Sequence, residues 1–379
     1  MLPETTFLVA CLRRCFQPNS PLPSAAELNW DGLLDLAHRH TVAPLLYAML
    51  HDAEVAPPDF LNRLRGSVQA IARFNLSLSA ELVRLLSIFG RHGIDVRPLK
   101  GPALSAALYG NLGFRTFADL DLLVRRKDVR PAKELVEAEG YRLISTLHWP
   151  VDSACLRARE SELSFLHSDN RIVIDLHWRI LPRYFPISFD VNQVWGTPRL
   201  VSLGGVEVPT LSPEHLLLFL CAHGTKHLWL RLGWICDLGR LIQLESGLDW
   251  ADVLAEATRT HTRRMVSLGL LLAADLLGVE PPLEARPFVD DRIARKLAGI
   301  IRQRVLIDAP FPPTGWDAGL LSVRALSRTS HRMSFVLGSL SPSEAEYRSL
   351  PLPPVLYWLY FPFRPLRLTV KYARRLTGL

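Results

Sequence analysis

Three aspartates are the residues in this chain best suited to chemistry. Asp119 and Asp121 stand one residue apart in FRTFADLDLLVRR, and Asp175 falls in the later run IVIDLHWRI. Because a strand alternates its side chains between two faces, we expect Asp119 and Asp121 to point the same way, with Leu120 and Leu122 directed into the protein. Two parallel carboxylates repel one another unless a cation lies between them, so the pattern predicts a divalent-cation site.

A glycine turn precedes this pair of aspartates. In IDVRPLKGPALSAALYG, we expect a short strand to about Leu99, a turn at Lys100-Gly101-Pro102, and then a helix. Such a turn lets backbone N–H groups approach a triphosphate, and the helix N-terminus favours the anion. Mg²⁺ prefers oxygen ligands and commonly bridges carboxylates to substrate phosphates. The segment therefore predicts a nucleoside triphosphate as substrate and Mg²⁺ (or Mn²⁺) as cofactor.

The composition is that of a globular protein with a basic surface. The chain has 379 residues, of which 49% are hydrophobic and 21% charged, with a formal net charge of +7. That charge suits a phosphate-bearing substrate, a nucleic acid or an anionic membrane, and equally a protein that binds none of these. The five cysteines include no Cys-x-x-Cys pair, which favours a reducing, cytoplasmic location. The sequence shows neither a signal peptide nor an apolar run long enough to span a membrane.

The pattern around these residues predicts helices, then strands, then helices. Apolar periodicity indicates helices in DGLLDLAHRHTVAPLLYAMLHD and GSVQAIARFNLSLSAELVRLLSIFGRHG. Hairpins are expected at Asp169-Asn170 and at Gly204-Gly205, and Ser212-Pro213-Glu214 predicts the start of a helix. The predicted fold class is α+β, a small mixed-sheet core flanked by N-terminal and C-terminal helical regions.

The end of the chain, PLPPVLYWLYFPFRPLRLTVKYARRLTGL, differs in composition from the helical region before it. It contains several prolines, is rich in aromatic residues, and ends in a basic stretch. It is either a tail packed across the domain or a segment that binds a partner or a membrane surface, since apolar aromatics followed by arginines suit an anionic interface. The predicted regions are an N-terminal helical region (1–92), an α/β core (93–210), a C-terminal helical domain (211–345) and this tail (346–379).

Three runs in order carry a resemblance to a known family: RPLKGPALSAALYGNLGFRTFADLDLLV, IVIDLHWRI and HGTKHLWLRLGWICDLGRLI. They resemble the bacterial family of uncharacterised nucleotidyltransferases, within the DNA polymerase beta-type nucleotidyltransferase superfamily. The resemblance covers about residues 25–245. It implies that Asp119, Asp121 and Asp175 are the catalytic, metal-binding carboxylates.

The resemblance also places the phosphate-binding turn, with one departure. Lys100-Gly101 takes the place of the usual Gly-Ser or Gly-Gly turn, and Pro102 stands where the superfamily commonly has serine or glycine. The hydroxyl that would contact a phosphate is missing. Nucleotide binding is therefore expected to use backbone N–H groups at Gly101, together with Lys100 and Arg115.

A second set of candidates centres on His223 and His227, whose spacing puts both rings on one face of a helix. The zinc-protease motif requires glutamate after the first histidine, and Gly224 stands there, so that interpretation fails. The resemblance implies that this helix faces the cleft and helps to hold substrate, while core histidines remain the alternative. The predicted substrate-binding residues are His177, His223, Lys226, His227 and Asp237.

Together these features predict a metal-dependent nucleotidyltransferase. It would move a nucleoside monophosphate from a nucleoside triphosphate to an acceptor hydroxyl or phosphate and release pyrophosphate. The resemblance leaves a peptide, a sugar and a small metabolite open as acceptors. A nucleic-acid acceptor is not expected, because no aromatic-rich RNA-binding module is visible. The alternative is a non-catalytic protein of the same fold that binds a peptide, a membrane surface or a nucleic acid, against which the intact aspartates argue.

Overall fold

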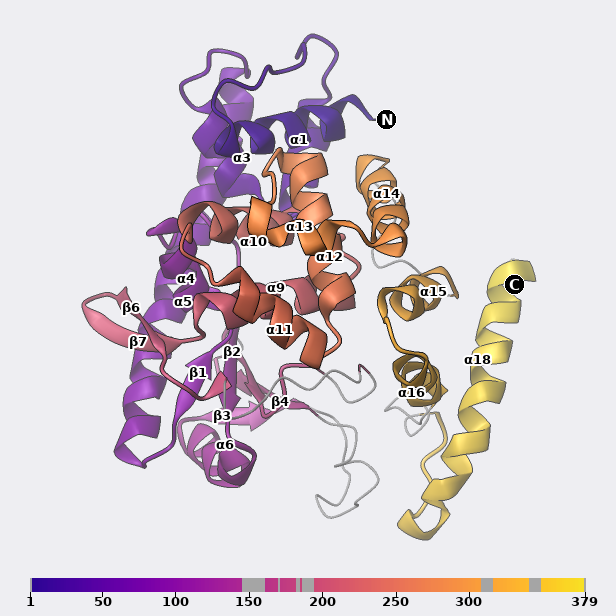
Figure 1. The fold of residues 1–379 in the computed structure, drawn as a ribbon. Helices are drawn as coiled ribbons and strands as arrows, with labels where there is room; N and C mark the ends of the chain where they lie inside the picture. Colours follow the sequence, from indigo (N-terminus) through magenta and orange to yellow (C-terminus); the bar gives the residue numbers. More distant parts are fainter. Residues whose placement is uncertain are drawn as a thin grey trace.

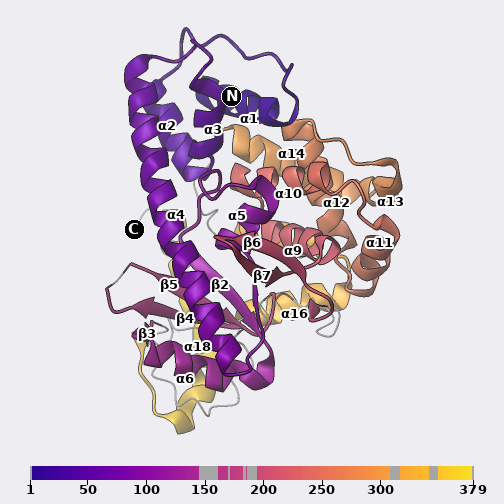
Figure 2. The same ribbon diagram turned by 90° about the vertical axis from the view of Figure 1, so that its left-hand side faces the viewer.

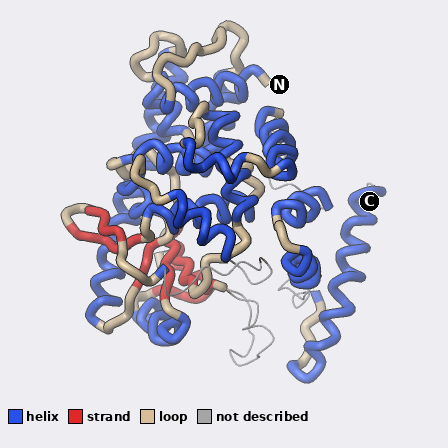
Figure 3. The backbone as a smooth tube through the Cα atoms, viewed as in Figure 1, coloured by secondary structure: helices blue, strands red, loops and turns tan. Residues whose placement is uncertain are grey.

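The computed structural model confirms a mixed helical and sheet architecture (Figure 1). It describes residues 2–144, 161–169, 171–181, 185, 194–307, 316–340 and 349–377. Asn170 of the first predicted hairpin turn and Cys155 lie outside these ranges. The cysteines within them, Cys11, Cys15, Cys221 and Cys236, are unpaired. Figure 3 shows the strands gathered in one part of the molecule, with helices around them.

A mixed sheet of five strands forms the centre of the fold. Its strands in spatial order are β1 (Val96–Pro98), β2 (Asp119–Val124), β5 (Val173–His177), β4 (Glu162–His167) and β3 (Tyr141–Leu143). β2 and β5 are parallel and the other neighbours are antiparallel. The expected β4–β5 hairpin is therefore confirmed.

The second predicted hairpin forms a separate sheet of two strands, β6 (Arg199–Leu203) and β7 (Val206–Thr210). It turns at Gly204 and Gly205, whose φ angles of 61° and 84° favour glycine. The Thr210 hydroxyl donates to the carbonyl oxygen of Pro98 at 3.3 Å, which ties this hairpin to β1.

Four helices precede the sheet: α1 (Pro3–Phe16), α2 (Trp30–Arg39), α3 (Ala43–Leu50) and α4 (Pro58–Arg91). α4 is 34 residues long and runs from these helices down to the sheet (Figure 2). Between the strands lie α5 (Gly101–Tyr109), the short η1 (Arg126–Asp128) and α6 (Val129–Ala138).

The sheet buries one face against α4 and α6. Leu120 and Leu122 of β2, with Ile174 and Leu176 of β5, join an apolar core that includes the lower part of α4 and the inner side of α6. Because the side chains alternate, the aspartates of these two strands point to the opposite face. α9 and α10 lie on that side.

A long series of helices follows the sheet. They are α9 (Pro213–Lys226), α10 (Leu232–Leu244), α11 (Trp250–Arg259), α12 (Arg263–Leu272), η2 (Ala273–Leu277), η3 (Leu283–Ala285), α13 (Arg286–Val289), α14 (Arg292–Leu306), α15 (Trp316–Ala325) and α16 (Thr329–Leu340). The Ser212 hydroxyl accepts from the backbone N–H of His215, so the predicted helix start is confirmed.

The first and last helical regions share one core. Side chains of α1 to α3 pack with those of α9, α10, α12 and α14 in a single apolar cluster. Arg13 donates to the carbonyl oxygens of Leu276 and Asp275, at 3.2 and 2.6 Å. The division of the chain into 1–92, 93–210, 211–345 and 346–379 stays a prediction, and these contacts show that its two helical regions are joined.

The last described elements are η4 (Pro354–Leu359) and α18 (Tyr360–Thr377). α18 lies at the edge of the molecule next to α16 (Figure 1). Exposed apolar side chains are found on all three elements: Met333, Val336, Leu337, Val355, Trp358, Phe361, Leu366 and Val370. Within the described residues, no helix has the length and hydropathy to cross a membrane.

Candidate active site

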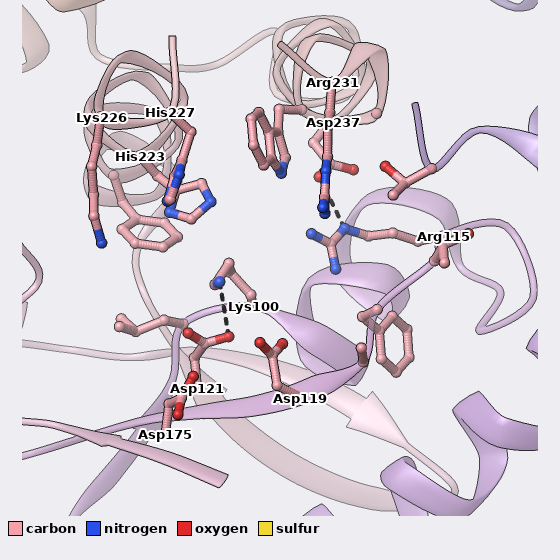
Figure 4. A pocket seen from close by; sticks show the side chains of 18 of the residues that line it. Lys100, Arg115, Asp119, Asp121, Asp175, His223, Lys226, His227, Arg231 and Asp237 are labelled. Atoms are coloured by element: carbon pink, nitrogen blue, oxygen red, sulfur yellow. Dashed lines mark hydrogen bonds and ion pairs between the residues drawn. The ribbon is translucent and has the colours of Figure 1, made fainter. Parts of the chain in front are cut away.

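A cavity of about 520 Å³ lies between the open face of the sheet and helices α9 and α10 (Figure 4). Ten of the residues singled out from the sequence line it: Lys100, Arg115, Asp119, Asp121, Asp175, His177, His223, Lys226, His227 and Asp237. Gly101 is not among its described lining residues. The structure thus brings side chains from two strands, two helices and two connecting segments into one place.

The parallel pairing of β2 and β5 sets the carboxylates side by side. Asp121 lies in register with Asp175, and Asp119 lies one pleat further along β2. Burial and the charge of Asp121 raise the pKa of Asp119 to about 6, and burial with the same charge raises the pKa of Asp175. Both shifts are the expected consequence of crowding like charges in a partly buried space.

Lys100 supplies one of the positive charges that compensate these carboxylates. Its Nζ lies 3.0 Å from Asp121 Oδ2, and only 17% of its side chain is exposed. Burial would lower the pKa of Lys100, but Asp121 and Asp119 outweigh it and raise the pKa. The next residue, Gly101, has φ of 65°, and a Cβ there would lie 3.3 Å from the carbonyl oxygen of Asp119. Glycine therefore lets the turn pass close to β2.

His177 is held between two carboxylates. Its Nε2 lies 3.1 Å from Asp121 Oδ1, and its Nδ1 lies 3.2 Å from Glu162 Oε2. Burial would lower the pKa of His177, but these two contacts raise it to about 9. With the ring protonated, Nε2 donates to Asp121 and Nδ1 is ion-paired with Glu162, so His177 fixes the orientation of Asp121.

The donor set fits a hard divalent cation. Ligand atoms of Asp121, Asp175 and His177 lie within 4.8 Å of one another, and Asp119 is outside this compact group of described residues. Asp175 Oδ1 is buried and has no hydrogen-bond partner in the described part of the chain. Because both nitrogens of His177 contact carboxylates, the available donors are carboxylate oxygens, which Mg²⁺ and Mn²⁺ prefer.

Arg115 makes a contact that the sequence did not indicate. Its Nε donates to Asp237 Oδ2 at 2.9 Å, and the Tyr109 hydroxyl donates to Asp237 Oδ1 at 3.1 Å. The side chains of Arg115 and Asp237 are only 10% and 2% exposed. Arg115 therefore links the segment before β2 to α10, at the edge of the cavity.

The last turn of α9 carries His223, Lys226 and His227 toward the carboxylates (Figure 4). Burial lowers the pKa of Lys226, and none of the described carboxylates lies within ion-pair distance of its amine. The following residues, Leu228 and Trp229, have φ of 54° and 52°, in the left-handed region that non-glycine residues seldom adopt. This constrained connection leads directly into α10 and fixes where both helices end at the cavity.

The N-terminal helices also reach the cavity. Thr41, between α2 and α3, lines it and has φ of 58°. The backbone N–H of Gly233 donates to the carbonyl oxygen of His40 at 3.0 Å, and a Cβ at Gly233 would lie 2.5 Å from the Thr41 hydroxyl. Glycine at the start of α10 therefore allows this close approach.

Several lining residues were missed by sequence reasoning: Thr41, Glu162, Phe219, Arg231 and Trp234. Glu162 had a usable signal, because the predicted hairpin pairs it with His177 across the strands. Phe219, Arg231 and Trp234 follow from how α9 and α10 pack on the sheet, which no local pattern reports.

The family model of an uncharacterised nucleotidyltransferase matches residues 26–278, more than half of the chain and every residue that lines the cavity. The chain belongs to this family of uncharacterised nucleotidyltransferases. No curated protein matches the chain, and no solved structure matches it.

Proposed function

We propose that this protein is an active, Mg²⁺- or Mn²⁺-dependent transferase. It moves a nucleoside monophosphate from a nucleoside triphosphate to an acceptor hydroxyl or phosphate and releases pyrophosphate. The observation that carries the proposal is the in-register pair Asp121 and Asp175, which faces a cavity lined by Lys100 and Lys226. Asp119, Asp121 and Asp175 would hold the metal, and Lys100, Arg115 and the N–H groups at Gly101 would bind nucleotide.

Different side chains of the protein bind the phosphates and accept the proton. The ammonium groups of Lys100 and Lys226 bind phosphate oxygens and hold the α-phosphorus in line with the acceptor. Asp175 Oδ1, which is buried and lacks a hydrogen-bond partner among the described residues, accepts the proton of the attacking hydroxyl. A bond forms between the acceptor oxygen and the α-phosphorus, and the bond from that phosphorus to the bridging oxygen breaks. A bound divalent cation would neutralise phosphate charge and favour ionisation of the hydroxyl.

The acceptor is proposed to be a peptide, a sugar or a small metabolite rather than a nucleic acid. The cavity, about 520 Å³, is of the size that holds small molecules, and its walls carry charged and ring side chains in close quarters. A non-catalytic binding protein has less support, because a crowded carboxylate site with a buried unpaired oxygen is costly to keep without a ligand.

The test is transfer of label from α-labelled nucleoside triphosphates. The four nucleotides are incubated separately with the protein, Mg²⁺ or Mn²⁺, and a cell extract as acceptor pool. We expect label on an acceptor and release of pyrophosphate. Asp121→Asn and Asp175→Asn should each lower the rate by at least about 100-fold, because charge stabilisation and proton transfer are both lost.

The matched control is Asp95→Asn, the same chemical change at a side chain that is 63% exposed and paired with Arg125 at 3.7 Å. It should keep the wild-type rate. Absence of transfer from any nucleotide, with wild-type protein that is folded and saturated with metal, would contradict the proposal and favour the binding protein.

We also propose a cytoplasmic location with peripheral membrane contact. The unpaired cysteines are the support for the compartment. The support for membrane contact is the exposed apolar surface of α16, η4 and α18, where Trp358 and Leu366 are 63% and 67% exposed and Arg364 and Arg367 lie close by in sequence. Apolar side chains beside arginines suit an anionic lipid surface.

A further inference from the structure

One wall of the cavity is built from aromatic rings. Phe219 and His223 of α9 and the following cap residue, His227, stand at four-residue spacing, and Trp234 of α10 packs beside them. We call these four residues the ring wall. Ring centroids are 5.7 Å apart for Phe219 and His223, 4.7 Å for His223 and His227, and 5.2 Å for His227 and Trp234. The rings therefore form one continuous cluster.

The ring wall faces the cavity and is only partly covered. All four side chains line the cavity. Phe219 is 2% exposed and supports the others from behind, while His223, His227 and Trp234 are half-buried. In Figure 4, His223 and His227 lie across the cavity from Asp119 and Asp121. The exposed ring surface thus lies opposite the carboxylates.

The two imidazoles are uncharged at neutral pH. Burial, with the charges of Lys226 and Lys100, lowers the pKa of His227 to about 4, and burial likewise holds the pKa of His223 well below its ordinary value. Neutral rings offer flat π faces rather than cationic contacts for phosphate. The positive charges that line the cavity come instead from Lys100, Arg115, Lys226 and Arg231.

A nucleoside triphosphate has two chemically distinct ends, an anionic triphosphate and a flat base. The cavity has a related division, with the carboxylates and Lys100 on the sheet side and the ring wall on the helix side, where Lys226 and Arg231 add positive charge beside the rings (Figure 4). Aromatic side chains bind bases by stacking, which depends on ring area and not on hydrogen-bond pattern. We propose that the ring wall is the nucleobase subsite, with the base stacked on His227 and Trp234. This inference rests on the proposed nucleotidyltransferase function.

Stacking predicts a graded base preference. Because purines present a larger flat surface than pyrimidines, we expect purine nucleoside triphosphates to bind a few-fold more tightly. The preference should be weak between adenine and guanine, since no base-edge contact is required by a stacked arrangement.

The test separates the base from the phosphates by using two probes, ATP and inorganic tripolyphosphate. Calorimetric titrations with Mg²⁺ compare the wild-type protein with Trp234→Leu and His227→Leu. Each substitution should weaken the binding of ATP about 5- to 100-fold and change the affinity for tripolyphosphate less than about twofold. Trp234→Phe, which keeps a ring, should recover most of the affinity for ATP. The control is Trp30→Leu, because Trp30 packs on Phe60 in the N-terminal helices, away from the cavity.

The other outcomes overturn the inference in distinguishable ways. If Trp234→Leu weakens the binding of ATP and of tripolyphosphate equally, Trp234 only shapes the cavity. If the substitution raises KM for the acceptor and leaves the affinity for ATP unchanged, the ring wall holds the acceptor, and the transferase proposal survives. If the wild-type protein binds tripolyphosphate and ATP with the same affinity, there is no base subsite. If it binds neither with Mg²⁺, the transferase proposal fails first.

Discussion

Asp237 and Arg115 form a buried ion pair at the edge of the cavity. Removing one member leaves the other charge without its partner, and such a change costs about 3–5 kcal/mol in a buried site. We expect Asp237→Asn to lower the free energy of unfolding by about 3 kcal/mol, measured by urea denaturation. The Tyr109 hydroxyl, which donates to the same carboxylate, adds to the loss.

The exposed Asp252→Asn is the matched control for that measurement and should stay within about 0.5 kcal/mol of the wild type. The double variant Arg115→Met, Asp237→Leu should recover part of the stability, since it removes both charges together. Equal destabilisation by Asp237→Asn and the control would show that the pair contributes nothing.

Lys100 compensates the carboxylates when no metal is bound. Its removal leaves Asp121 with His177 as the nearby positive group, so Lys100→Met should lower the melting temperature in EDTA by several degrees. Because a divalent cation relieves the same repulsion, adding Mg²⁺ should raise the melting temperature of Lys100→Met more than that of the wild type. Differential scanning calorimetry with and without Mg²⁺ checks both. An identical Mg²⁺ response in the two proteins would contradict a cation site beside Lys100.

At the scale of single residues, the aspartates could be predicted because a strand's alternation is local information. Asp119, Asp121 and Asp175 lie on one side of the sheet as the pattern indicates. The partner of Arg115 could not be predicted, because Asp237 is 122 residues away and belongs to another helix. Contacts of that kind depend on how elements pack.

At the scale of elements, Gly224 and Gly299 make a matched pair of helix glycines. A Cβ at Gly224 in α9 would lie 2.6 Å from the Trp229 ring, whereas one at Gly299 in α14 would meet nothing within 4 Å. Gly299→Ala should stabilise the protein by roughly 0.5–1 kcal/mol through helix propensity. Gly224→Ala should destabilise it by about 1–3 kcal/mol through overpacking. Urea denaturation measures both, and the same sign for both would disprove the tight packing of Trp229 on α9.

Asp291 caps α14 and ties it to α12. Its Oδ1 accepts from the backbone N–H groups of Ile293 and Ala294, and its Oδ2 accepts from Arg264 at 2.8 Å. Loss of such a cap costs about 1–2 kcal/mol, so Asp291→Ala should lower the free energy of unfolding by that amount at pH 7.

The same carboxylate gives a pH dependence of known sign. Burial would raise the pKa of Asp291, but the backbone N–H of Ala294 and Arg264 outweigh it and lower the pKa below its usual value. The stabilisation is therefore complete above the unfolded pKa of about 3.9 and is lost as pH falls through the folded pKa. The difference in the free energy of unfolding between the wild type and Asp291→Ala should be constant from pH 7 to about pH 5 and should then shrink. A difference that grows on acidification would refute this sign.

Elements with a clear period or turn were predictable. The hairpins β4–β5 and β6–β7 and the helix after Ser212 have local signals in the sequence, and the structure has them. The positions of α9 and α10 over the sheet had no such signal. They are set by the left-handed backbone at Leu228 and Trp229 and by the close approach of Gly233 to Thr41.

At the scale of the whole molecule, the cavity forms where two apolar cores meet. One core fills the space between the sheet, α4 and α6, and the other joins the first and last helical regions. The proposed metal-binding carboxylates and Lys100 come from the sheet side, and Lys226 and the ring wall come from the helical side. The predicted boundary at residue 92 separates residues that line the same cavity. Thr41, for example, belongs to the region before this boundary and lines the cavity.

The outer surface of α16, η4 and α18 leads to the last prediction. Trp358, Phe361 and Leu366 are 63%, 50% and 67% exposed, which is unusual for a surface without a partner. If this surface contacts an anionic membrane, the protein should sediment with vesicles that contain phosphatidylglycerol and much less with neutral phosphatidylcholine vesicles. Salt should weaken the association, because the arginines act through screened charge.

The variant for this experiment is Phe361→Ser, Leu366→Ser, which removes apolar contact and leaves every arginine in place. It should lose most of the vesicle binding, since each buried methylene contributes about 0.8 kcal/mol, while transfer of label to a soluble acceptor stays unchanged. The control is Leu283→Ser, which is 66% exposed and lies in η3, away from α18 in sequence. Equal binding of the control and the double variant would mean that charge alone attracts the protein. A change of oligomeric state in the double variant, seen by sedimentation velocity, would show instead that a second copy of the chain covers this surface.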